Sequence, residues 1–108
     1  MLIIKIKYYY LIILERVFMK LIQKLKQFEK QIIFLRWASN AEYGKLKYVG
    51  FDYIEFQVLN VDEMEFSEII FINYQLILEV VIGGIDVSRI IAEYSSKLPL
   101  YKQLDEIN

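Results

Sequence analysis

The chain has 108 residues, 56% of them hydrophobic, and its 13 Lys/Arg and 14 Asp/Glu leave a net charge of −1. This length allows one domain with a modest core, and so high an apolar fraction excludes disorder as the main state. The sequence contains no cysteine and no histidine, which excludes disulfides, thiolate nucleophiles and the commonest general base and zinc ligand.

Charge is divided unequally along the chain. Residues 1–50 hold ten Lys/Arg and three Glu, a net charge of +7, whereas residues 51–108 hold three Lys/Arg and eleven Asp/Glu, a net charge of −8. This asymmetry makes the molecule dipolar and favours contact between oppositely charged surfaces. Neither half has the uniformly basic footprint typical of a nucleic-acid binder.

The residue bias also indicates an origin. Isoleucine occurs 18 times, lysine 10 times and tyrosine 9 times, against three alanines and three arginines. The favoured residues have AT-rich codons, and AT-rich genomes include those of plastids and several reduced bacteria. We therefore expect the protein in a plastid (chloroplast) or a bacterial cytoplasm.

Residues 1–18 form a hydrophobic N-terminal extension. Its longest uninterrupted apolar run, Tyr8 to Leu14, has seven residues, whereas a membrane span needs about 20. The order of basic then apolar residues is typical of a signal peptide, but no small-residue cleavage site follows, so we do not expect secretion. A membrane-surface anchor is the alternative, and Met19 is a second candidate start of the chain.

Residues 15–30 have the period of an amphipathic helix. The apolar stripe consists of Val17, Phe18, Leu21, Ile22, Leu25 and Phe28. Lysines, among them Lys20 and Lys24, occupy the opposite face, which is either a solvated surface or a dock for acidic lipid or nucleic acid.

Strand-like stretches follow, separated by turn residues. We expect strands at residues 32–37, 43–49, 51–59, 66–72 and 76–82, with a polar loop at 38–41, a hairpin loop at 60–64 and a tight turn at 73–75. In the third strand Ile54, Phe56 and Val58 share one face, and Tyr53, Glu55 and Gln57 share the other, which predicts a half-buried strand.

A short helix and a tail complete the predicted domain. Gly83 and Gly84 end the last strand, and Asp86 is the expected N-cap of a helix that runs to about Ser95. Pro99 stops the helix. The sequence thus predicts one domain over residues 19–98, of the α+β and mainly β class, with a tail at 99–108.

The order of these elements resembles that of the Sm-like family, a small SH3-like barrel. The residues that carry the resemblance are Gly44-x-Leu46 and Val49-Gly50-Phe51-Asp52, which correspond to the strongly bent second strand. The resemblance implies a five-stranded antiparallel barrel after an N-terminal helix. The chain also looks like small conserved proteins of cyanobacteria and plastids with no assigned activity.

The family's RNA-binding positions differ in this chain. Members that bind uridine-rich RNA carry an Asn shortly after the Asp, where this sequence has Ile54 and Glu55. They also carry Arg-Gly or Lys-His near the end of the fourth strand, where Asn73-Tyr74 occurs. Carboxylates repel phosphate, so RNA binding is disfavoured although it stays an alternative through the basic N-terminal half.

Catalytic and ligand motifs are weak. The acidic series Asp62-Glu63-Met64-Glu65 lacks the alternating ligands and the glycine of a calcium loop. The pair Ser96-Lys97 is a poor nucleophile pair, because a catalytic lysine must be buried. We therefore expect no catalytic, cofactor-binding or metal-binding residues, and no small-molecule substrate.

These observations favour a non-enzymatic protein-interaction module, such as an assembly or accessory factor. Its partner would be another protein or further copies of the chain, bound by strand addition at a sheet edge or by ring formation. RNA and a membrane surface, the latter through residues 1–18, are the alternatives. The candidate interaction surface consists of Lys20, Lys24, Lys45, Lys47, Trp37, Tyr43, Tyr48 and Tyr53.

Overall fold

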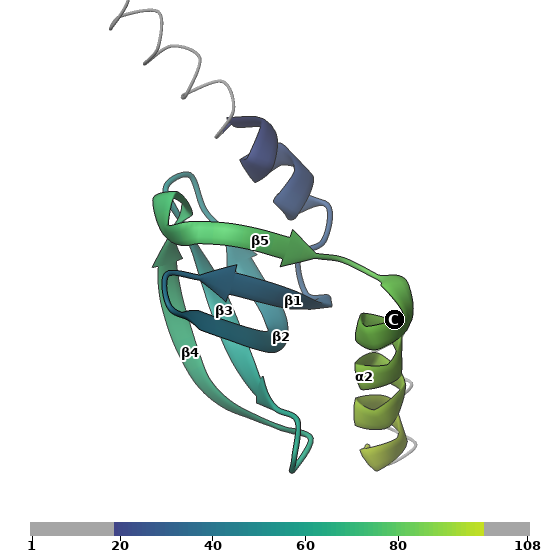
Figure 1. Cartoon of the computed structure of the whole chain (residues 1–108). Coiled ribbons are helices and arrows are strands. Elements are labelled where there is room, and N and C mark those ends of the chain that lie inside the picture. The colour runs from purple at the N-terminus through teal and green to yellow at the C-terminus, as the bar shows by residue number, and fades with distance from the viewer. Residues whose placement is uncertain (1–18, 99–108) are drawn as a thin grey trace, which may run out of the picture.

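The structure, a computed structural model, describes residues 19–98 and has an α+β fold that is mainly β (Figure 1). The five strands are β1 (Ile32–Trp37), β2 (Asn40–Val49), β3 (Tyr53–Asn60), β4 (Glu65–Asn73) and β5 (Ile77–Val81). A helix at 19–26 precedes them, the 3₁₀ turn η1 (Tyr74–Leu76) separates β4 from β5, and α2 (Gly84–Lys97) follows. The predicted fold class and element order are confirmed.

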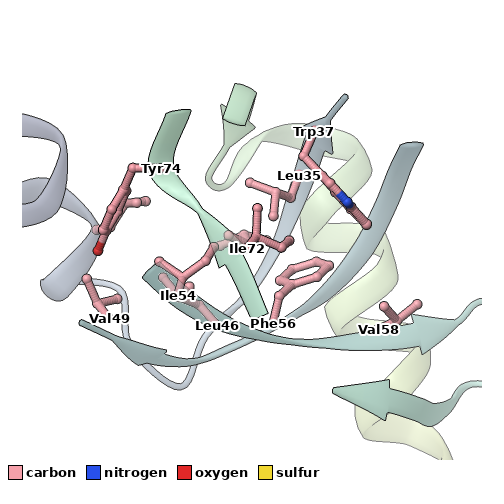
Figure 2. Close-up of a cluster of buried hydrophobic side chains, with 11 residues drawn as sticks. Leu35, Trp37, Leu46, Val49, Ile54, Phe56, Val58, Ile72 and Tyr74 are labelled. Atoms are coloured by element: carbon pink, nitrogen blue, oxygen red, sulfur yellow. The ribbon is translucent and has the colours of Figure 1, made fainter. Parts of the chain in front are cut away.

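All strand pairs are antiparallel, and the sheet order is β4-β3-β2-β1-β5. The sheet curls around one core, because its two edge strands contribute to the same buried cluster. Ile70 and Ile72 come from β4, while Ile77 and Val80 come from β5. Figure 2 shows this cluster, to which Leu35 and Trp37 of β1, Phe56 of β3 and Ile72 of β4 contribute.

Alternation along β3 separates the inner face of the sheet from the outer face. Ile54, Phe56 and Val58 are buried, whereas Tyr53, Glu55 and Gln57 point outward, as predicted from the period of two. Phe56 is fully buried, and its ring lies 5.8 Å from that of Trp37 in β1. Because β2 lies between these two strands, the Phe56 ring reaches Trp37 by lying over Gly44 of β2, which has no side chain to block it.

The helix α2 covers part of the outer face. Ile90 joins Leu59 and Met64 in a second buried cluster, against which Ile32, Tyr43, Phe66 and Tyr94 pack. The rings of Phe66 and Tyr94 meet edge to face at 5.0 Å. Lys97 Nζ, at the end of α2, donates to the carbonyl oxygen of Glu63 in the β3–β4 loop. Figure 1 shows α2 beside the strands and the 19–26 helix at the other end of the sheet.

The N-terminal helix packs its apolar stripe on the main core but is shorter than predicted. Leu25 is buried, and Leu21, Ile22 and Phe28 pack against the core. The helix ends at residue 26 rather than 30, because a turn follows in which Lys30 adopts φ 71°. Val17 and Phe18, the remaining stripe residues, lie outside the described part, as do the 1–18 extension and the 99–108 tail.

Two predicted boundaries are corrected. The helix α2 begins at Gly84 with Gly83 as its N-cap, so Asp86 lies in the first turn and is not the cap. The positive φ angles of Gly83 (74°) and Gly84 (82°) let the chain turn directly into the helix. The loop predicted at 38–41 is only a turn at 38–39, because β2 already starts at Asn40.

Candidate interaction surface

Three exposed aromatic side chains lie together on the outer face, beyond the part that α2 covers. Tyr48 of β2 is 45% exposed, Tyr53 of β3 37% and Phe71 of β4 65%. The ring of Tyr53 lies 6.0 Å from that of Tyr48 and 5.9 Å from that of Phe71, in tilted and edge-to-face contacts. We call these three residues the aromatic patch.

Strand register explains why these residues meet. In the sheet, Tyr48 pairs with Glu55, and Glu55 pairs with Phe71. A register shift in β2 between Leu46 and Tyr48 brings Tyr48 level with Glu55 on the outer face. The half-buried side chain of Glu55 therefore lies between two members of the aromatic patch, and Tyr53 lies two residues before it on the same face.

The strands that carry most of the aromatic patch are acidic. Residues 51–82 contain seven Asp/Glu and no Lys or Arg. The edge strand β4 includes Glu65 and Glu68, both exposed, and the loop before it includes Asp62 and Glu63. These four carboxylates lie towards the far end of the β3–β4 hairpin, so the acids beside the aromatic patch are Glu55, on the same face, and Asp52, next to Tyr53 in the sequence.

The four lysines of the predicted interaction surface occupy three different places. Lys20 and Lys24 are exposed on the N-terminal helix. Lys45 is half-buried in β2 with its Nζ 6.0 Å from the centre of the Phe66 ring. Lys47 is exposed at the register shift of β2.

The aromatic residues of the predicted surface also separate. Trp37 is only 7% exposed and belongs to the main core, because residue 37 falls on the inner face of β1. Tyr43 is half-buried, packs against the cluster beneath α2 and contacts Phe34 at 5.1 Å. Only Tyr48 and Tyr53 share one exposed surface, and Phe71, which sequence reasoning missed, joins them. Phe71 belongs to the apolar run 69–72, and only the β3–β4 register shows that Ile69 and Phe71 are its outward residues.

A buried tyrosine anchors the loop below the aromatic patch. Tyr74 of η1 donates its hydroxyl to the carbonyl oxygen of Gly50 at 2.7 Å. Burial, with smaller contributions from Glu29, Tyr48 and Asp52, raises the pKa of Tyr74 from 10 to about 12. Asn73 Oδ1 accepts from the backbone N–H of Gln75 and caps η1. The Tyr74–Gly50 bond therefore ties the loop that leads into Tyr53 to η1.

The raised pKa of Tyr74 predicts a loss of stability in alkali. The unfolded phenol releases its proton near pH 10, whereas the folded one holds it to about pH 12. The stabilising contribution is therefore complete below pH 10 and is lost as the pH rises from 10 towards 12, by up to about 3 kcal/mol. Urea unfolding between pH 8 and 11.5 should show this decline in the wild type.

The variant Tyr74→Phe tests whether the loss of stability in alkali is caused by Tyr74. We expect it to cost about 1–2 kcal/mol at pH 7, because the carbonyl of Gly50 loses its hydrogen bond. Its stability should then fall less steeply than that of the wild type above pH 10. Equal slopes for the two proteins would assign the alkaline decline to other groups.

The side chains of the weak catalytic and metal-binding motifs make local hydrogen bonds and do not come together in one site. Asn60 Oδ1 accepts from the backbone N–H groups of Asp62 and Glu63, so the acidic series forms a capped hairpin loop. Ser96 Oγ donates to the carbonyl of Glu93 within α2, while Lys97 reaches Glu63 instead. Among residues 19–98, no three His, Cys, Asp or Glu side chains are grouped as metal ligands would be.

Within the same residues, no helix has the length and apolar character that crossing a bilayer requires. Comparison of the whole chain with protein-family models, with curated proteins and with solved structures finds no match.

Proposed function

We propose that the protein is a non-enzymatic interaction module, an assembly or accessory factor of a plastid or a bacterial cytoplasm that works through protein–protein contacts. The observation that carries this proposal is the aromatic patch at the β4 edge of the sheet. Exposed rings beside an unpaired strand edge are the features that protein partners use most often.

Both edges of the sheet support the proposal. β4 pairs only with β3, and β5 pairs only with β1, so within the described chain each edge strand has one free side. Large apolar residues point outward along both edges: Ile69 and Phe71 on β4, and Leu78 and Val81 on β5. An extended segment of a partner can add to such an edge through backbone hydrogen bonds. The aromatic patch lies beside β4, so we propose the β4 edge as the one that binds the partner.

A relationship to the Sm-like family is part of the same proposal. The order of a helix, four meandering strands, a 3₁₀ turn and a last strand that returns to β1 supports it. In such a fold, contacts between opposite edges of successive copies generate rings when the rotation closes.

A charge on the β4 edge tests the proposed function. We expect Phe71→Lys to reduce the amount of co-purifying partner at least about tenfold, since lysine on an edge strand blocks strand addition and one ring of the aromatic patch is lost. The measurement is quantitative mass spectrometry of proteins retained by the tagged chain in an extract of its native compartment.

Leu78→Lys is the matched control, because Leu78 is also 65% exposed but lies on the β5 edge. It should retain the partner that Phe71→Lys releases. Retention of the same proteins by both variants and the wild type would contradict a function of the β4 edge. Co-purification of nuclease-sensitive RNA in place of protein would favour the RNA alternative through Lys20 and Lys24.

A further inference from the structure

We propose that the aromatic patch and Glu55 receive an arginine or lysine side chain from an extended partner segment that adds to the β4 edge. This inference rests on the proposed function and specifies the chemistry of its partner: a segment with a cationic residue at the position level with Phe71. The occupant is another protein's chain, not a nucleic acid or a small molecule.

Register sets where the cationic side chain would lie. Tyr48, Glu55 and Phe71 are lateral neighbours on three successive strands, all on the outer face. A strand added to β4 would continue this line, about 4.8 Å beyond Phe71. An outward side chain at that point can extend back over the Phe71 ring towards the carboxylate of Glu55. Alternate residues of the added strand would face outward in the same way.

The chemistry of this surface favours a cation. Aromatic rings attract ammonium and guanidinium groups through their negative faces, and a neighbouring carboxylate adds a charged acceptor. The outer face already contains two such contacts within the chain: Arg36 lies 5.8 Å from the Phe34 ring centre, and Lys45 lies 6.0 Å from that of Phe66. The ring of Phe71 lies at the edge, where a partner has access.

Charge complementarity supports the same conclusion. Residues 51–76, which include β3, β4 and the turns beside them, have six acidic side chains and no basic one, and Glu55 and Asp52 are the acids nearest to the aromatic patch. The exposed Lys47 lies on β2, two strands away from the free side of β4 where the cationic segment would approach. The β5 edge differs. Its outward Glu79 is already the register partner of Arg36 in β1, and its exposed residues Leu78 and Val81 are aliphatic, so they offer no ring face to a cation. The β4 edge is therefore the one that suits a cation.

Peptide titration tests the inference with the full-length protein. The probes are two capped heptapeptides, Thr-Arg-Thr-Arg-Thr-Arg-Thr and the same sequence with glutamine at each arginine position. We expect the arginine peptide to bind at least about tenfold more tightly than the glutamine peptide, with amide chemical-shift changes centred on β4. Its affinity should fall as NaCl is raised, since the attraction is partly electrostatic.

Two substitutions and two matched controls locate the contact. Glu55→Gln and Phe71→Leu should each weaken binding of the arginine peptide about threefold or more, while leaving the weak binding of the glutamine peptide unchanged. Glu79→Gln removes the same charge from the β5 edge, and Leu78→Ala trims an equally exposed apolar residue there. Both controls should bind the arginine peptide like the wild type. Amide spectra of each variant without peptide establish that the fold is retained.

The results separate this inference from the proposed function. Equal affinity for both peptides, with shifts on β4, would overturn the cation site and leave strand addition intact. Binding of the arginine peptide that is insensitive to Glu55→Gln and Phe71→Leu would likewise overturn it, as would failure of that peptide to perturb β4. In each case the proposed function is tested separately, by whether Phe71→Lys loses the native partner as expected.

Discussion

Replacing Phe56 with alanine is expected to destabilise the protein by about 3–5 kcal/mol, the largest loss that we expect from a single substitution. The side chain is fully buried, contacts the Trp37 ring and belongs to the main core cluster (Figure 2). Its removal leaves a cavity that a curved sheet with fixed register cannot close. Because a domain of this size is stable by about 5–15 kcal/mol, this loss is a large fraction of the total free energy of unfolding.

Urea unfolding followed by far-UV circular dichroism measures this loss. Phe71→Ala is the matched control, since Phe71 lies on the adjacent strand but points to the outer face and is 65% exposed. We expect Phe71→Ala to lower the free energy of unfolding by no more than about 1 kcal/mol, which is the usual contribution of a cross-strand aromatic pair such as that with Tyr53. Similar losses in the two variants would mean that Phe56 does not occupy the centre of the core.

Gly44→Ala is expected to cost about 3 kcal/mol, although it adds only one methyl group. A Cβ at residue 44 would lie 2.5 Å from the carbonyl oxygen of Gln57 and 2.5 Å from Cζ of Phe56. Gly44 is buried on the inner face of β2, so neither neighbour can move into solvent. The glycine thus provides the space in which the Phe56 ring lies.

A double-mutant cycle tests whether the loss of stability in Gly44→Ala comes from a steric clash with the Phe56 ring or from replacing a glycine as such. Phe56→Leu removes the ring atoms nearest to residue 44, so Gly44→Ala combined with Phe56→Leu should lose less than the sum of the single losses. Gly84→Ala is the second comparison: its φ is 82° but nothing lies within 4 Å of the added Cβ, so its cost is backbone strain alone, about 1–2 kcal/mol. Additive losses in the cycle would contradict contact between residues 44 and 56.

Much of the fold is predictable because alternation is a local property. The strand β1 has the predicted bounds, Ile32–Trp37. The buried and exposed faces of β3 follow from the identity of every second side chain between Tyr53 and Val58. Turn chemistry similarly places the hairpin loop at 60–64 and the tight turn after Asn73, where a side-chain oxygen caps η1.

Features that depend on distant partners were not predictable in this way. Tryptophan is a residue type that is common in interfaces, but the register of β1 with β2 and β5 places Trp37 on the buried inner face of the sheet. Phe71 is one of several apolar residues in β4, and only its pairing with Glu55 places it beside Tyr53. The N-cap of α2 is Gly83 and not the predicted Asp86, because two successive glycines adopt positive φ angles. A pattern of apolar residues does not predict such angles.

The pairing of β5 with β1 has a consequence for how the chain folds. The meander from β1 to β4 needs only short-range hairpins, whereas β5 must return from the far end of that meander to reach Leu35 and Phe34. Loop-closure entropy opposes this step until the hairpins exist. We therefore expect the meander to form first and β5 to dock late. We also expect β5, with one neighbour and five residues, to be the strand that opens most readily in the native state.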